Sequence, residues 1–183
     1  MLNEIRRFYS SGNIHCLLYE DDRGLQGQYL TWHQNGQLKR RAYYKDHKLH
    51  GTTDTWRPDG TRIASYTYQE GIACGLQQRW YENGNLEERF TEIEDSKEGI
   101  SEEWYEDGSP FTKAMYKNDD LHGEYKMWSE TGVLQEHEIW IEDGLLIDFM
   151  DPGNTAPLTK AEKAAFILRH PEAIFLPDEQ DEI

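Results

Sequence analysis

Histidine and cysteine are the residues of this chain whose chemistry would be most specific, because they bind metals and act in catalysis. There are seven histidines and two cysteines. His50 and His122 occupy equivalent places in a repeated pattern, three repeats apart, and no cluster of Cys or Asp completes a coordination sphere. We therefore predict that they bond to the backbone and bind no metal. Cys16 and Cys74 fall at different positions of the pattern, which predicts reduced thiols.

Motifs of catalysis and cofactor binding are absent from the sequence. It contains no glycine-rich phosphate loop, no nucleophile elbow and no His-Glu zinc motif. After Ile147, where the repeated pattern ends, only 36 residues remain, fewer than a catalytic domain needs. We predict that the protein is not an enzyme and needs no cofactor.

The charge of the chain indicates the chemistry of its partners. Nineteen Lys and Arg stand against 35 Asp and Glu, a net charge of -16. This balance disfavours nucleic acid and anionic membranes and favours a basic protein partner. Eleven acidic residues lie between Glu82 and Asp107, opposed only by Arg89 and Lys97. This acidic belt is either neutralised by a cationic partner or a solvated surface that keeps sheet edges from aggregating.

Segments for export or membrane insertion are not found. Residues 1–11 have no apolar stretch behind their charges, and no later run approaches the roughly 18 apolar residues of a membrane span. We expect a soluble, cytoplasmic protein.

A repeat of 24 residues organises the chain. Its tryptophans are Trp32, Trp56, Trp80, Trp104 and Trp128. Its turn glycines are Gly36, Gly60, Gly84, Gly108 and Gly132. A strict period of this kind indicates one supersecondary unit that is stable only when stacked on copies of itself. We predict that these tryptophans and glycines are structural, with the tryptophans forming the stacking core.

Each copy has the pattern of a β-hairpin. Asn-Gly or Asp-Gly ends most of the turns, and both residues tolerate positive φ, as a hairpin requires. Residues 38–45 and 62–69 are rich in aromatic and β-branched types and predict second strands. Acidic or glycine-containing links lead to the next copy. The predicted fold is mainly β, an elongated single-layer antiparallel sheet of stacked hairpins with a short C-terminal helix.

The period divides the chain into four segments. Residues 1–147 hold six copies, the first degenerate because Phe8 replaces the tryptophan. Residues 148–158 form a linker, 159–177 a helix and cap, and 178–183 an acidic tail. Thr159 and Glu162 form a capping-box pattern. We expect the side of the helix around Phe166, Ile167 and Leu168 to dock on the open end of the sheet.

The spacing of glycine, tryptophan, turn glycine and a Tyr-rich strand resembles the MORN repeat. Residues 80–86 (WYENGNL) and 32–38 (WHQNGQL) are similar to the bacterial variant found in antitoxin-like proteins. The resemblance covers residues 3–147. It implies a single layer of stacked hairpins used for protein association, and an antitoxin or immunity role. It supplies no catalytic residue.

A partner surface is predicted in the third and fourth full-length copies. The residue after each tryptophan varies, which suggests a surface on the opposite face of the sheet. There Tyr81 and Tyr105 would anchor a basic partner, and Glu87, Glu88, Glu102 and Glu103 would attract it. The leading hypothesis is a bacterial antitoxin or immunity protein that occludes a basic toxin. The alternatives are a self-assembling scaffold and an acidic DNA mimic. The sequence does not settle the oligomeric state.

Overall fold

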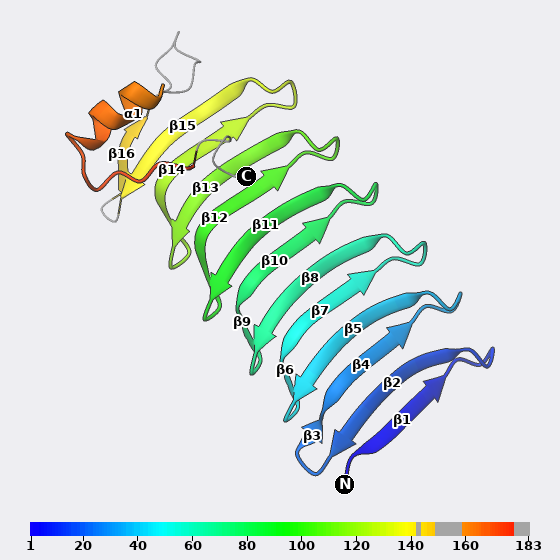
Figure 1. The fold of residues 1–183 in the computed structure, drawn as a ribbon. Coiled ribbons are helices and arrows are strands. Elements are labelled where there is room, and N and C mark those ends of the chain that lie inside the picture. Colours follow the sequence, from blue (N-terminus) through cyan, green and yellow to red (C-terminus); the bar gives the residue numbers. More distant parts are fainter. Residues whose placement is uncertain (142–143, 149–158, 178–183) are drawn as a thin grey trace. The chain divides into compact units, whose positions relative to one another are not determined.

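The computed structural model describes residues 1–141, 144–148 and 159–177. The chain divides into two compact units, Met1–Asp95 and Ser96–Ile183. Both consist of antiparallel β-hairpins, and the described residues include one short C-terminal helix (Figure 1). The predicted mainly β fold is confirmed, and the elongated shape stays a prediction. The predicted linker, apart from Asp148, and the acidic tail at 178–183 lie outside the described residues.

The first unit holds four hairpins in chain order. Its strands are β1 (Asn3–Phe8), β2 (Ile14–Asp21), β3 (Gly24–Leu25), β4 (Gly27–Trp32), β5 (Leu38–Lys45), β6 (Lys48–Leu49), β7 (Gly51–Trp56), β8 (Arg62–Gln69), β9 (Ile72–Ala73), β10 (Gly75–Trp80) and β11 (Leu86–Ile93). They pair in the order β1-β2-β4-β5-β7-β8-β10-β11, and the short β3, β6 and β9 pair with β2, β5 and β8. The strands predicted at 38–45 and 62–69 are β5 and β8.

The second unit continues the pattern and adds a cap. Its elements are β12 (Ser96–Trp104), β13 (Pro110–Lys117), β14 (Asp120–Trp128), β15 (Leu134–Ile141), β16 (Gly144–Asp148) and α1 (Lys160–Ile167). The strands pair in this order. Thr159 and Glu162 form the predicted capping box at the start of α1. No helix among the described residues has the length and apolar character to cross a membrane.

The turn after each Trp strand has a different conformation from the one expected. Gly36 has a φ of +87°, whereas Asn35 is not among the residues with positive φ. Instead, the Asn35 side chain accepts a hydrogen bond from the Gln37 backbone N–H at 3.1 Å. The same contact is made in three other turns, by Asp59, Asn83 and Asp107. The hairpins are confirmed, but Asn and Asp serve as acceptors for the turn backbone, and only glycine takes positive φ.

The left-handed residue pairs lie in the links at the other end of the hairpins. Glu94 and Asp95 have φ of +54° and +65°. The Asp95 carboxylate accepts a hydrogen bond from Ala73 N–H at 2.6 Å, and Asp95 N–H donates to the Ala73 carbonyl at 3.0 Å. Asp119 makes the same two bonds to Lys97, at 2.7 and 3.1 Å. The carboxylates of these two links therefore tie neighbouring hairpins together, which gives the acidic links a structural role.

The repeat tryptophans are less buried than a stacking core would require, and three alanines of the sheets are more buried than any of them. Ala42, Ala64 and Ala114 are 0 %, 6 % and 2 % exposed, whereas all five repeat tryptophans are half-buried. A guanidinium lies above two of the indole rings: Arg41 is 5.6 Å from the Trp56 centroid, and Arg62 is 5.1 Å from that of Trp80. A single layer leaves its large rings partly open, because no second layer covers them.

Candidate protein-binding surface

The predicted carboxylates of the first unit are bound to a cation of their own sheet. Arg79 lies 3.0 Å from a Glu87 oxygen and 3.3 Å from a Glu88 oxygen. Arg79 stands directly opposite Glu88 across β10 and β11, so their side chains share a face. The structure therefore brings these two predicted contact residues together, but around the guanidinium of Arg79 in the same sheet.

The predicted carboxylates of the second unit lie on opposite faces of β12, because they are consecutive in the strand. Glu102 is 9 % exposed, and its carboxylate lies 3.2 Å from the ammonium group of Lys113. Glu103 is half-buried on the other face, opposite Thr112. Glu102 is thus part of the interior of its unit, and Glu103 lies on the opposite face of the sheet.

In several copies the residue at the start of the turn links neighbouring hairpins. The Tyr105 hydroxyl donates to the Trp128 carbonyl at 2.8 Å, and the Tyr9 hydroxyl donates to the Trp32 carbonyl at 2.7 Å. His33 Nε2 lies 2.8 Å from the next tryptophan carbonyl. Tyr81 belongs to the first unit and Tyr105 to the second. Sequence reasoning missed this bridging role. Its signal was the frequency of Tyr, His and Arg, all hydrogen-bond donors, at this position.

Replacing Tyr105 by phenylalanine tests the bridge. The variant keeps the ring but leaves the Trp128 carbonyl without its donor, so we expect a loss of about 1 kcal/mol in the free energy of unfolding. The matched control is Tyr125→Phe, since the Tyr125 hydroxyl has no hydrogen bond to any described residue. Urea unfolding followed by far-UV circular dichroism measures both. Equal effects of the two substitutions would argue against the bridge.

The two faces of the second unit differ in what covers them. On one face lies Glu124, which is 0 % exposed. One of its carboxylate oxygens is 2.6 Å from His137 Nε2 and 2.9 Å from Lys126 Nζ. The other accepts a hydrogen bond from Leu176 N–H at 2.8 Å and lies 4.0 Å from Lys163 Nζ. We call this side the Glu124 face, and the C-terminal segment covers it.

The electrostatics of Glu124 follow from its neighbours. Burial acts to raise its pKa, but the hydrogen bond with His137 and the charges of Lys126 and Lys163 outweigh burial and lower the pKa below its ordinary value. The carboxylate is therefore ionised at neutral pH, and His137 must donate the proton in their hydrogen bond. Glu124 joins two strands, the helix and the segment after the helix.

The prediction that the helix docks through Ile167 and Leu168 was wrong. Ile167 and Leu168 are 42 % and 86 % exposed, whereas Ala173 and Leu176, which follow α1, are 7 % and 3 % exposed. Phe166 contacts Phe175, with ring centroids 5.8 Å apart. The segment after the helix therefore makes the contact, because its backbone N–H reaches the buried carboxylate, and α1 packs against that segment.

The opposite face carries an aromatic and acidic surface. Its members are Glu103, Tyr116, Tyr125, Met127, Glu136, Glu138 and Trp140. Met127 stands opposite Glu136, and Tyr125 stands opposite Glu138, across β14 and β15. We call this set the Tyr125 surface. Burial, followed by the charges of Glu136 and Glu138, raises the pKa of Tyr125 to about 12. The phenol therefore remains protonated beside carboxylates at neutral pH.

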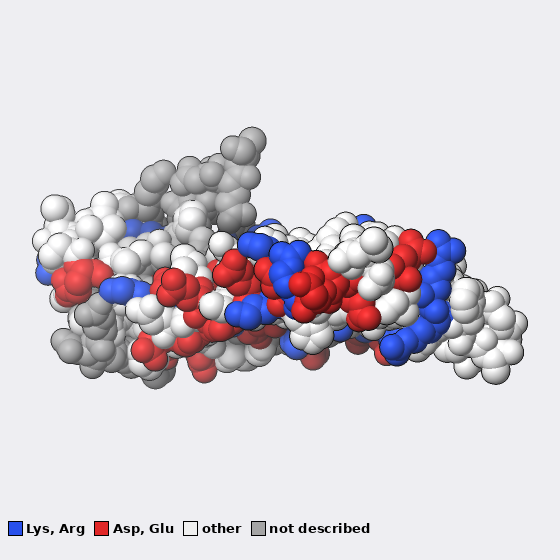
Figure 2. Space-filling model, turned by 90° about the horizontal axis from the view of Figure 1, so that it is seen from below, with Lys and Arg blue, Asp and Glu red and all other residues white. Residues whose placement is uncertain are grey.

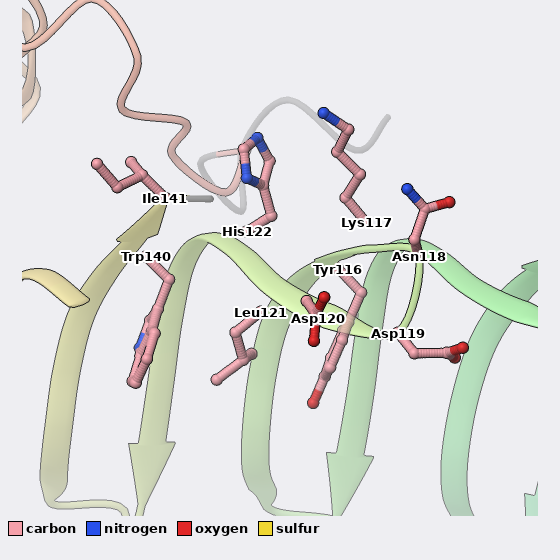
Figure 3. Close-up of a pocket in the computed structure, with 9 residues that line it drawn as sticks. All are labelled: Tyr116, Lys117, Asn118, Asp119, Asp120, Leu121, His122, Trp140 and Ile141. Atoms are coloured by element: carbon pink, nitrogen blue, oxygen red, sulfur yellow. The ribbon is translucent and has the colours of Figure 1, made fainter. Parts of the chain in front are cut away.

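A hollow of about 550 Å³ adjoins the Tyr125 surface where β13, β14 and β15 meet their links. Figure 3 shows Tyr116, Leu121 and Trp140 extending to one side, while Lys117 and His122 point to the other. Trp140 Nε1 donates a hydrogen bond to Glu138 at 2.7 Å, which fixes the indole beside a carboxylate. Aromatic rings next to carboxylates suit the side chain of an arginine or lysine.

Negative charge is concentrated in the second unit. Residues 96–183 contain 7 Lys and Arg against 21 Asp and Glu, whereas residues 1–95 contain 12 against 14. Figure 2 shows one side of the molecule, on which Asp and Glu form several groups with Lys and Arg between them. Among the described residues, no group of three or more His, Cys, Asp or Glu could hold a metal ion. His50 Nδ1 lies 3.4 Å from Glu70 N, close to the backbone contact predicted for it.

Comparison with known proteins matches the hairpins to one family. A model described as the MORN repeat variant matches residues 25–46, 73–91, 97–118 and 121–141. A search of curated proteins gave no match. Repeats of this kind indicate a protein that mediates protein interactions. The four matches fall on four copies of the 24-residue pattern, two in each unit, and the chain is therefore a repeat protein that contains MORN variant repeats.

Proposed function

We propose that this protein is a non-catalytic interaction protein that binds a basic protein through the Tyr125 surface. The observation that carries the proposal is the geometry of that surface. Tyr116, Tyr125 and Trp140 lie on the same face as Glu136 and Glu138, and the C-terminal segment occupies the other face. A partner that reaches this sheet from solvent meets the aromatic and acidic face.

The mechanism of binding is electrostatic attraction followed by aromatic contact. Carboxylates attract a cationic partner and speed its encounter, and the effect falls as salt screens the charges. The rings and Met127 then provide the apolar contacts that dominate affinity in protein interfaces. Arg and Lys side chains of the partner enter the hollow beside Trp140, where a ring face and the Glu138 carboxylate act together.

Within this function, we propose that the partner is a toxin and that the protein is a bacterial antitoxin or immunity protein, acting in the cytoplasm. The support for this class is the similarity of the repeats to the variant found in bacterial antitoxin-like proteins, together with the acidic surface. Occlusion requires no catalytic group in the inhibitor. A sheet face that covers the active surface of a basic toxin neutralises it by steric exclusion.

Photo-crosslinking in the cells that make the protein tests the proposal. A benzophenone amino acid placed at Met127 should yield a covalent adduct with a protein of positive net charge. The adduct should be lost when Glu136→Lys is added and kept when Glu130→Lys is added, because Glu136 lies on the surface and Glu130 in a turn. A second probe at Val133, which is 52 % exposed, serves as the positional control.

Two outcomes of this experiment would contradict the proposal. One is the absence of any adduct from the Met127 position. The other is the same set of adducts from Val133. Toxin neutralisation has its own readout: the identified partner, expressed alone, should arrest growth, and co-expression of the wild-type protein should restore growth whereas the Glu136→Lys variant should not.

A further inference from the structure

A second hollow, of about 520 Å³, lies in the first unit. It is lined by His15, Tyr29, Thr31, His33, Lys39, Arg40, Thr55, Trp56, Arg57, Pro58 and Ile63. Tyr29 and Arg40 occupy the repeat positions that Tyr125 and Glu136 occupy in the second unit. The same place in the repeat therefore carries a cation here and a carboxylate there.

The cations of this hollow have no acidic neighbour within it. Lys39, Arg40 and Arg57 line it, and no Asp or Glu does so. Arg57 donates to two backbone carbonyls, those of Arg62 at 3.2 Å and Tyr81 at 3.3 Å. A group of cations without a neighbouring carboxylate is unusual in so acidic a chain, because 35 carboxylates are available to pair with 19 cations.

Arg40 is the cation of the hollow that has a donor without a partner in the part of the chain that the structure describes. Its Nε is buried and has no hydrogen-bond partner among the described residues. Its cross-strand neighbours are Thr31 and Thr55. Neither carries a negative charge that could pair with the guanidinium. Arg41, the next residue, faces the other side and is paired with Asp54 at 2.7 Å. A buried donor without a partner is destabilising, and an oxyanion bound to Arg40 would supply the missing partner.

The walls of the hollow are aromatic and apolar. Tyr29 supplies a ring, and Pro58 and Ile63 supply aliphatic surface. A small inorganic anion would contact the cations but leave these walls unfilled. A ligand that joins a negative group to an apolar body contacts both.

We propose that this hollow binds an oxyanion, carboxylate or phosphate, carried on an aromatic or other apolar body. The guanidinium of Arg40 presents parallel N–H donors that match two oxygens of such a group, and Lys39 adds a second charge. The Tyr29 ring and the Ile63 side chain contact the body of the ligand. The negative group belongs either to a small organic anion or to an acidic residue next to an apolar one in a peptide. This site is independent of the Tyr125 surface.

Isothermal titration calorimetry with defined probes tests the site. The probes are phenyl phosphate, the peptide acetyl-Phe-Glu-Phe-amide, and phenol as the uncharged control. We expect at least one charged probe to bind the wild-type protein, and phenol to bind at least tenfold more weakly. The Arg40→Gln variant should bind that probe at least tenfold more weakly. Lys48→Gln, which removes one charge from an exposed link of the same unit, should bind it as the wild type does.

The comparison of probes identifies the source of the negative group. Tighter binding of phenyl phosphate would indicate that the ligand is a small organic anion. Tighter binding of the peptide would indicate that the ligand is an acidic peptide. Lys39→Gln, an exposed position, provides a second variant with an expected loss of about threefold, should Arg40→Gln disturb the fold. The proposal is overturned if neither charged probe binds at millimolar concentration, if phenol binds equally well, or if Arg40→Gln and Lys48→Gln behave alike.

Discussion

Replacing Glu124 by glutamine is expected to lower the free energy of unfolding of the second unit by about 3–5 kcal/mol, because removal of a buried charge leaves its partners uncompensated. Glu124 is 0 % exposed and contacts His137, Lys126 and the backbone of Leu176. An uncharged amide cannot balance the ammonium groups, and its NH₂ group faces other donors.

The Glu124 carboxylate also makes the stability of the second unit depend on pH, and the direction of its pKa shift gives the sign of that dependence. Because the folded pKa of Glu124 lies below the ordinary value of 4.5, the unfolded chain takes up the proton more readily than the folded protein. The contribution of Glu124 is fully present above the unfolded pKa and is lost as the pH falls through the folded pKa. The advantage of the wild type over Glu124→Gln should therefore be constant at neutral pH and shrink below about pH 4.5.

Urea unfolding of both proteins between pH 7 and pH 3 measures this difference. Glu136→Gln is the control, since Glu136 is exposed and a surface change of this type stays within about 0.5 kcal/mol. A Glu124→Gln protein as stable as Glu136→Gln would contradict the buried network. A wild-type advantage that grows in acid would contradict the sign of the pKa shift.

Replacing Gly123 by alanine is the second substitution for which we expect a large effect. Gly123 has a φ of +116°, and an added Cβ would lie 3.0 Å from the Ile174 carbonyl oxygen and 3.1 Å from the Met115 Cβ. The backbone strain and the collision with the C-terminal segment together predict a loss of about 2–5 kcal/mol. Because the collision involves the segment that covers the Glu124 face, that segment should leave the sheet.

Hydrogen exchange of the Leu176 amide detects this release, because that N–H is bonded to Glu124. We expect exchange to accelerate at least tenfold in Gly123→Ala. Gly99→Ala is the matched control, since Gly99 opens the preceding copy, has a φ of +73° and has no atom within 4 Å of an added Cβ. Unchanged protection in Gly123→Ala, or equal acceleration in both variants, would show that the segment does not depend on this close approach.

The repeat pattern was sufficient to predict the hairpins. Strand boundaries followed from the turn glycines, so that residues 38–45 and 62–69 were placed correctly. The capping box of Thr159 and Glu162 likewise located the start of α1. These features depend on residues a few positions apart, and local backbone preferences decide them.

Contacts between copies could not be predicted in the same way. The Tyr105 bond to Trp128 and the Asp119 bonds to Lys97 join residues in different hairpins. Their existence depends on the stagger between hairpins, which a periodic sequence does not specify. No bonding role was therefore predicted for the acidic links, although the carboxylates of Asp95 and Asp119 bond to the backbone of neighbouring links.

The candidate surface was only partly predictable. Strand alternation already separates Glu102 from Glu103, yet both were assigned to one surface because acidity was considered by segment and not by face. Glu103 does lie on the Tyr125 surface. The role of the C-terminal segment required the structure, because it depends on Leu176 reaching a carboxylate 52 residues away in the sequence.

Affinity for the partner captured at Met127, measured against salt, tests the central claim most directly. Wild type and Glu130→Lys should bind the purified partner equally and lose affinity between about 0.05 and 0.3 M salt, since screening weakens charge attraction. Glu136→Lys should bind at least tenfold more weakly at low salt and with a smaller salt dependence. Equal affinity of Glu136→Lys and Glu130→Lys across that range would contradict recognition of a basic protein by the Tyr125 surface.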